Sequence, residues 1–182
     1  MLTDVRGRRA APAPTTWNVV KTLAQTVAFW GVFLLLLPRL VYAVETAVLG
    51  EAWRFAGTAS RSAGIVLFAL FGTLGLSCGL LIAVRGHGTP LPLDAPRTLV
   101  VAGPYRFVRN PMAVAGIGQG LAVGLMLGSP AVLLYALAGA FVWHGVARPW
   151  EERDLVAWFG EPYLAYRRAV RCWWPRWRPF PP

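Results

Sequence analysis

Two short stretches carry residues whose types could do chemistry. The first is Gly103-Pro104-Tyr105-Arg106-Phe107-Val108-Arg109-Asn110-Pro111-Met112, which places arginines, an amide and two prolines between two long apolar segments. The second is Glu151-Glu152, just beyond the next apolar block. A helix that begins at Pro111 with arginines beside it could hold an anionic group. The two glutamates could accept hydrogen bonds from an ammonium group or from ribose hydroxyls.

A site with both signs of charge suits a zwitterionic ligand that also has an apolar or aromatic part. An adenosyl amino acid, a nucleotide and a phospholipid head group all meet this description, and the residues alone do not choose between them. Neighbouring helix positions point about 100° apart, so Glu151 and Glu152 are expected to have different roles. Two histidines at distant positions, His87 and His144, do not make a metal cluster.

The composition predicts that these stretches are positioned by a membrane protein. Of the 182 residues, 56% are hydrophobic and only 14% are charged, which is too apolar for an ordinary soluble domain. Nine tryptophans fit a protein with two membrane–water interfaces. The net charge of +10 could indicate nucleic acid or a membrane surface. The long apolar runs and the absence of a nucleic-acid-binding motif favour the membrane.

The order of apolar and polar segments predicts an all-α integral membrane protein with about four transmembrane helices. A flexible basic tail at 1–16 precedes a single domain at 17–182, and a kink is expected near Pro38. Gly128-Ser129-Pro130 divides the last uncharged block into a tight helical hairpin. The expected spans are 17–44, 62–84, 112–127 and 131–147, followed by short cytoplasmic helices within 149–172, while the polar, proline-rich loop at 85–111 has backbone amides free to meet a ligand.

Four spans place the N-terminus, the 85–111 loop and the C-terminus on the same side of the membrane. These three regions hold 15 of the 18 basic residues. By the positive-inside rule this side is cytoplasmic. Both stretches of possible chemistry therefore lie on one side, as a joint site requires.

The pattern resembles a known family. Gly103-Pro104-Tyr105-Arg106-x-x-Arg109-Asn110-Pro111, a glycine-rich span, Glu151-Glu152 and Phe159-Gly160-x-x-Tyr163-x-x-Tyr166 are similar, in this order and spacing, to the isoprenylcysteine carboxyl methyltransferase and phospholipid methyltransferase superfamily. Gly86-x-Gly88-Thr89-Pro90 resembles bacterial members, and the likeness covers residues 86–175. The resemblance implies a membrane methyltransferase that uses S-adenosylmethionine near the cytoplasmic surface of the bacterial inner membrane, with an acceptor that enters from the bilayer.

The resemblance also implies which residues form the site. Catalytic roles are expected for Arg109, Asn110 and Glu152. The expected cofactor-binding set is Gly103, Pro104, Tyr105, Arg109, Asn110, Pro111, Gly116, Glu151 and Glu152. The chain departs from the family where histidine often stands at the position of Asn110 and an aromatic residue often stands at Met112 or Ala113. Asparagine donates and accepts hydrogen bonds but carries no charge, which argues against a proton shuttle at this position.

Other interpretations remain open at this point. Arg106 and Arg109 could be ordinary membrane anchors, and Glu151-Glu152 could be acids at a helix start. The function could be that of a membrane reductase that uses NADPH, or of a non-catalytic lipid-binding scaffold. The acceptor of a methyltransferase could be an isoprenylcysteine-like carboxylate, a phospholipid amine or a small thiol.

Overall fold

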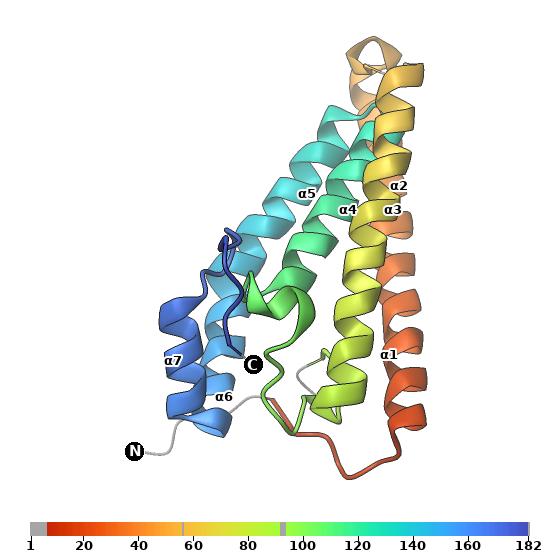
Figure 1. The fold of residues 1–182 in the computed structure, drawn as a ribbon. Coiled ribbons are helices and arrows are strands. Elements are labelled where there is room, and N and C mark those ends of the chain that lie inside the picture. Colours follow the sequence, from red (N-terminus) through yellow and green to blue (C-terminus); the bar gives the residue numbers. More distant parts are fainter. Residues whose placement is uncertain (1–6, 56, 92–93, 182) are drawn as a thin grey trace.

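The computed structural model describes residues 7–55, 57–91 and 94–181, and the chain within these ranges is helical (Figure 1). No strand is present there, and one isolated bridge pairs Arg9 with Ala95. Three helices are long and apolar enough to cross a membrane: Thr15–Leu49, Thr58–Gly86 and Pro130–Phe159. The predicted helical membrane architecture is therefore confirmed. The parts of the predicted tail and loop at 1–6 and 92–93 lie outside the described residues.

The first long helix continues through its proline. It consists of α1 (Thr15–Phe29), a π-helical segment at Trp30–Leu36 and α2 (Leu37–Leu49). Proline has no backbone N–H and crowds the preceding turn, and a π turn relieves this mismatch. Here the Leu37 N–H donates to the Val32 carbonyl five residues earlier. The helix thus reaches Leu49, past the predicted end of the first span at 44.

Glycines bring the second long helix close to the short helix α4 (Pro111–Leu127). The second long helix comprises α3 (Thr58–Leu81) and a π-helical end at Ile82–Gly86. A Cβ atom at Gly64 would lie 2.6 Å from the Met126 side chain, and one at Gly118 would lie 2.5 Å from the Phe71 ring. Any larger side chain at either position would force the two helices apart, so glycine is what permits this packing.

A two-residue turn joins α4 to α5 (Pro130–Val142). Gly128 ends α4 with φ +61°, and the Ser129 side chain caps α5 by accepting a hydrogen bond from the Val132 N–H. This break falls where the sequence places it. At 17 residues, α4 is about 26 Å long and falls short of a 30 Å hydrocarbon core. A fourth full crossing therefore stays a prediction.

The third long helix differs from the prediction at its C-terminal end. The sequence predicts separate helices, one ending at 147 and the next beginning at 149. Instead α5, a π-helical segment at Trp143–Ala147 and α6 (Arg148–Phe159) form one continuous helix. The π turn again precedes a proline, Pro149, which sits in the first turn of α6. Gly160 at φ +56° then turns the chain into α7 (Glu161–Ala169).

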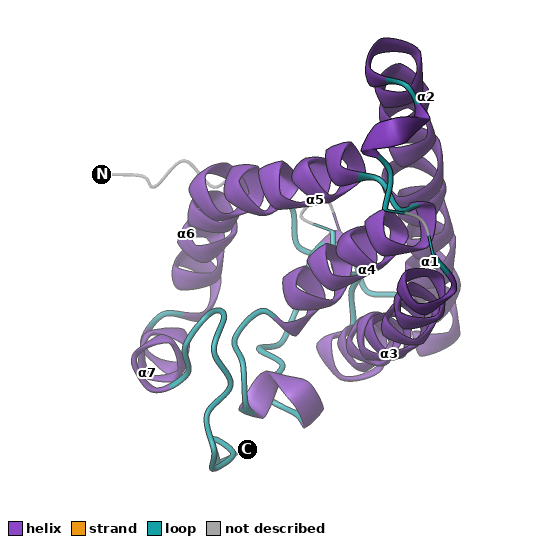
Figure 2. Ribbon diagram, turned by 90° about the horizontal axis from the view of Figure 1, so that it is seen from above, coloured by secondary structure: helices purple, strands orange, loops and turns teal. Residues whose placement is uncertain are grey.

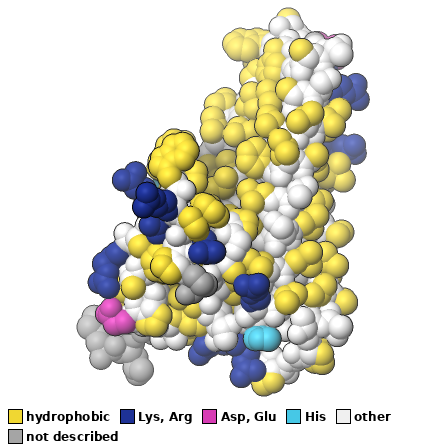
Figure 3. Space-filling model, in the orientation of Figure 1, with side chains coloured by type: hydrophobic (Ala, Val, Ile, Leu, Met, Phe, Trp, Pro, Cys, Tyr) yellow, Lys and Arg dark blue, Asp and Glu magenta, His cyan; other side chains and the backbone are white. Residues whose placement is uncertain are grey.

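Both ends of the chain return to one end of the helix bundle (Figures 1 and 2). The C-terminal segment runs along the loop before α4, where the Arg176 N–H donates to the Phe107 carbonyl and the Phe180 N–H to the Arg106 carbonyl, both at 2.9 Å. The N-terminal segment reaches α6, where the Gly7 N–H donates to Asp154 at 2.7 Å. On the face shown in Figure 3, apolar side chains cover the long helices and basic side chains gather mainly toward the lower end.

Candidate functional site

The loop before α4 is fixed by a buried tyrosine pair. Residues Gly103–Arg106 form a short 3-10 turn whose Tyr105 is buried. The Tyr166 hydroxyl, on α7, donates to the Tyr105 carbonyl at 2.6 Å. Burial raises the pKa of Tyr166 well above its usual range, so the hydroxyl keeps the proton that it donates. The pair holds the loop against α7 and thereby sets the direction in which Arg109 and Asn110 leave it.

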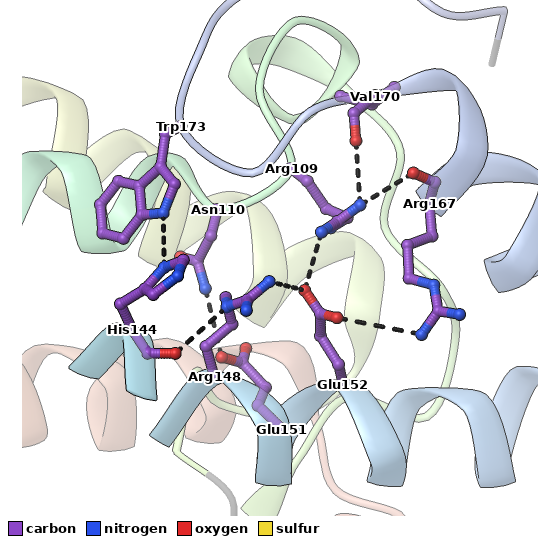
Figure 4. A network of polar contacts seen from close by, with 9 residues as sticks. All are labelled: Arg109, Asn110, His144, Arg148, Glu151, Glu152, Arg167, Val170 and Trp173. Atoms are coloured by element: carbon purple, nitrogen blue, oxygen red, sulfur yellow. Dashed lines mark hydrogen bonds and ion pairs between the residues drawn. The ribbon is translucent and has the colours of Figure 1, made fainter. Parts of the chain in front are cut away.

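Asn110 links the start of α4 to α6. Its Oδ1 accepts from the Ala113 N–H at 3.0 Å, which is an N-cap, and Pro111 occupies the first turn. Its Nδ2 donates to Glu151 at 3.2 Å (Figure 4). A single amide thus caps one helix and contacts a carboxylate on another, and it needs both its acceptor and its donor to do so.

Arg109 ties three elements together. Its Nη1 donates to the Arg167 carbonyl at 2.8 Å and to the Val170 carbonyl at 3.1 Å, and its Nη2 pairs with Glu152 at 2.8 Å (Figure 4). Its own backbone N–H donates to the Arg171 carbonyl at 2.9 Å. The guanidinium therefore donates to the end of α7 and to α6. These contacts fix the loop before α4 against both helices, which is the role of a positioning residue.

Glu152 is the centre of an arginine cluster. Besides Arg109, Arg148 lies 3.4 Å and Arg167 lies 3.9 Å from its carboxylate oxygens. The Glu152 side chain is only 16% exposed. Three cations around one half-buried carboxylate compensate the cost of removing it from water, and they leave it little capacity to accept from a ligand.

Glu151 has a different environment, although it is the adjacent residue. It is exposed, and among the described residues only the Asn110 amide donates to it. The surrounding protein mass desolvates its carboxyl group, and with the charge of Glu152 this raises the pKa of Glu151 to about 7, against the opposing effects of Asn110 and Arg109. Although nearby protein atoms desolvate the carboxyl group, the residue is exposed, so a ligand can still reach it. Glu151 lies beyond the uncharged part of its helix, which ends before Arg148.

A histidine and a tryptophan flank the cluster. The Trp173 indole N–H donates to His144 Nδ1 at 2.9 Å, and the ring of Trp143 packs edge-on against Trp173 at 5.3 Å. The His144 carbonyl accepts from Arg148 at 3.3 Å. Since Nδ1 accepts, this network assigns the proton of a neutral His144 to Nε2. His144 thus joins the C-terminal segment to the start of α6.

The structure brings together part of the predicted site. Arg109, Asn110, Glu151 and Glu152 share one network, and Pro111 begins the helix that Asn110 caps. Tyr105 and its neighbours Gly103 and Pro104 are tied to the network through α7. Gly116 is not: it is exposed, and a Cβ atom there would meet nothing within 4 Å.

Sequence reasoning missed three residues of the network: Arg148, Arg167 and Trp173. The spacing of Arg148 and Glu152, four residues apart on a helix, is a signal that could have found the first. Nothing local marks Arg167 or Trp173, because tertiary packing alone brings α7 and the C-terminal segment to the site. Among the described residues no three His, Cys, Asp or Glu side chains are grouped as metal ligands.

The chemistry of this site is that of cation recognition beside a helix start. It offers one accessible carboxylate and one amide, both fixed by a frame of arginines around Glu152. In a comparison with known protein families, a family model described as phospholipid methyltransferase matches residues 60–162. The match runs from α3 into α7 and includes the whole Asn110–Glu151 pair. No curated protein matches the chain.

Proposed function

Because the chain belongs to the phospholipid methyltransferase family, we propose that it transfers a methyl group from S-adenosylmethionine to a lipophilic or membrane-embedded acceptor. The family is one of methyltransferases, and the chain has three helices long and apolar enough to cross a membrane, so both findings support a membrane methyltransferase. We place the 85–111 loop and both termini on the cytoplasmic side of a bacterial inner membrane, which is the side that the basic residues favour.

The observation that supports this cofactor most strongly is the contrast between Glu151 and Glu152. Glu152 is already neutralised by arginines, whereas Glu151 is exposed and has a single amide partner. A carboxylate that is accessible and incompletely compensated fits an ammonium group or the hydroxyls of a ribose. S-adenosylmethionine carries both, so the residues present fit the cofactor.

In this proposal Glu151 and Asn110 contact the cofactor, and Arg109 and Glu152 hold them in place. The bound cofactor would supply a methyl group on a positively charged sulfur, which an acceptor attacks in line. Such a displacement depends on alignment and on exclusion of water more than on an acid or a base. Asn110 cannot take a proton. The site as built therefore suits an acceptor that arrives as a carboxylate or thiolate, while an amine must lose its proton elsewhere.

The proposal is tested by calorimetry on the full chain in detergent or nanodiscs, titrated with S-adenosylmethionine and separately with NADPH. We expect saturable binding of the first only. Glu151→Gln should weaken binding by about tenfold to a hundredfold, since one charge-assisted hydrogen bond contributes on the order of 1.5–3 kcal/mol. Glu161→Gln is the matched control, because Glu161 is a 78% exposed carboxylate at the start of α7.

Three outcomes would contradict the proposal. Binding of NADPH alone would favour a reductase, and binding of neither cofactor would favour a lipid-binding scaffold. Equal affinity of the two variants for S-adenosylmethionine would remove Glu151 from the cofactor site. If S-adenosylmethionine binds as expected, an assay of methyl transfer from labelled cofactor to extracted native lipids would identify whether the acceptor is a carboxylate, an amine or a thiol.

A further inference from the structure

A polar pocket with none of the Glu151 network in its lining lies between the N-terminal segment and the end of the second long helix. It has a volume of about 430 Å³ and is lined by Arg9, His87, Arg97 and Thr98. All four residues are exposed, and none of them is acidic. Figure 3 shows a histidine among basic side chains at the lower end of the molecule, the end at which the Arg9–Ala95 bridge closes the loop after α3.

The cationic charge of this pocket is not compensated within the described part of the chain. No described carboxylate forms an ion pair with Arg9 or Arg97. The Arg9 guanidinium donates to the Arg97 carbonyl at 2.5 Å and stacks over the Phe159 ring at 5.3 Å. These contacts orient Arg9 without neutralising it. The cluster around Glu152 is the opposite case, since there three arginines face a carboxylate.

Hydrogen bonds and close contacts hold the described backbone around the pocket. The Arg97 N–H donates to the Gly86 carbonyl at 2.7 Å, and the Thr98 hydroxyl donates to the Arg85 carbonyl at 2.7 Å. A Cβ atom at Gly86 would lie 2.8 Å from Pro96, so the two sides of the loop are in close contact. Paired backbone hydrogen bonds join Ala95 to Arg8 and Ala10, both at 2.9 Å. Arg9 is therefore held against the loop by its neighbours on both sides.

His87 sits in this pocket with unfavourable backbone geometry. Its φ is +55°, and it is the one non-glycine residue with a positive φ in the described chain. A left-handed conformation is costly for a residue with a side chain, and such strain persists at functional sites when the surrounding structure imposes it. Glycines stand on both sides, at 86 and 88, yet the chain keeps an imidazole at the strained position.

We propose that the pocket of Arg9, His87, Arg97 and Thr98 binds the phosphoryl group of an anionic phospholipid headgroup. Two guanidinium groups and an imidazole are donors that suit phosphate oxygens, while the Thr98 hydroxyl, which donates to the Arg85 carbonyl, lines the pocket without supplying a donor. His87 directly follows the second long helix, Thr58–Gly86. The exposed apolar surface of this helix ends one turn before His87, at Val84, which is 48% exposed. A lipid whose chains lie along α3 thus has its headgroup at the level of the pocket. This site is independent of the proposed methyl transfer.

The test measures binding of short-chain phosphatidylglycerol and of inorganic phosphate to the full chain in a phosphate-free detergent. We expect saturable binding of the lipid, weakened about tenfold by Arg97→Gln, because a hydrogen bond to a charged group contributes on the order of one tenfold factor or more. Arg178→Gln, which removes an exposed arginine outside the pocket, should leave the affinity within about twofold.

A second variant separates binding from folding. His87→Gly relieves the positive φ, so the unfolding temperature should stay constant or rise while lipid affinity falls. A merely structural histidine would lower stability and leave affinity unchanged, and that result overturns the role of His87. Inorganic phosphate binding as tightly as the lipid would keep the anion site and overturn the lipid as its source. No saturable binding of either, or equal effects of R97Q and R178Q, would overturn the site itself.

Discussion

The continuous helix from Pro130 to Phe159 has a carboxylate of another helix beside its N-terminus and two carboxylates of its own in α6, and these differ in their access to solvent. At the α5 end, Glu45 from α2 is 5% exposed, hydrogen bonds with the Ser129 hydroxyl and accepts from the Ala131 N–H at 2.9 Å. There the carboxylate complements the helix N-terminus and is shut in. At the α6 end, Glu152 is neutralised by arginines and Glu151 stays accessible.

This difference shows how to distinguish a structural acid from a ligand-binding one in this protein. A structural acid has its oxygens occupied by donors that would otherwise be buried without partners. A ligand-binding acid has an open side and a neighbour that fixes its position. By this criterion Glu45 and Glu152 are structural, and Glu151 is the acid available to a ligand.

Glu45→Ala should lower the free energy of unfolding by about 3 kcal/mol, because it leaves one buried and one partly buried donor without partners. Glu45→Gln keeps an acceptor and should cost less than half as much. The measurement is denaturant or thermal unfolding in detergent, with Glu51→Ala as control. Glu51 is 77% exposed and should contribute less than about 0.5 kcal/mol. An effect of Glu45→Ala no larger than that of its control would refute the cap.

Arg109→Gln should lower stability by about 2 kcal/mol and weaken cofactor binding through displacement of the loop, since it breaks ties to α6 and to the end of α7. Arg109→Lys keeps the charge but lacks the planar fork that reaches two carbonyls and a carboxylate, so it should not restore wild-type behaviour. Unfolding and calorimetry on the same samples check this. Full rescue by lysine would mean that only the charge at position 109 matters.

The affinity for a cationic cofactor should rise with pH and level off above about pH 7, as the raised pKa of Glu151 is passed. Below that pKa the expected slope is at most tenfold per pH unit. The unbound protein behaves oppositely: the folded state binds more protons than the unfolded state between about pH 4.5 and 7, so stability falls as pH rises through this window. Both dependences should vanish in Glu151→Gln, and calorimetry and unfolding as functions of pH would show whether they do.

Asn110→Ala should cost about 1 kcal/mol of stability, the usual effect of losing an N-cap. Asn110→Asp keeps the cap but places a second negative charge beside Glu151, which should raise the pKa of Glu151 further and move the pH dependence of cofactor binding upward. The comparison of the two variants separates the capping role of Asn110 from its contact with Glu151. Identical pH profiles of cofactor binding in Asn110→Asp and wild type would contradict a contact between residue 110 and Glu151.

Much of the fold follows from local sequence. The uncharged runs predict the long helices, and the helix break at Gly128-Ser129-Pro130 needs only a left-handed glycine, a capping serine and a proline suited to a first turn. The error falls at Pro149, where the sequence predicts that one helix ends and another begins. There a π turn at Trp143–Ala147 lets the helix continue. At Pro38 a single span with a kink is predicted, and the helix does continue there, with a π turn at Trp30–Leu36 before the proline.

Apolar runs, turn residues and motif spacing are local properties of the chain, and they are sufficient to identify a helical membrane protein of the phospholipid methyltransferase family. The sequence also predicts different roles for the two adjacent glutamates, but not which role belongs to which residue. Tertiary contacts give the two residues different environments: α7 and the loop before α4 bring Arg109 and Arg167 to Glu152, and Asn110 to Glu151. These environments cannot be read from the sequence because ion pairing, desolvation and access to water depend on contacts between residues far apart in the chain.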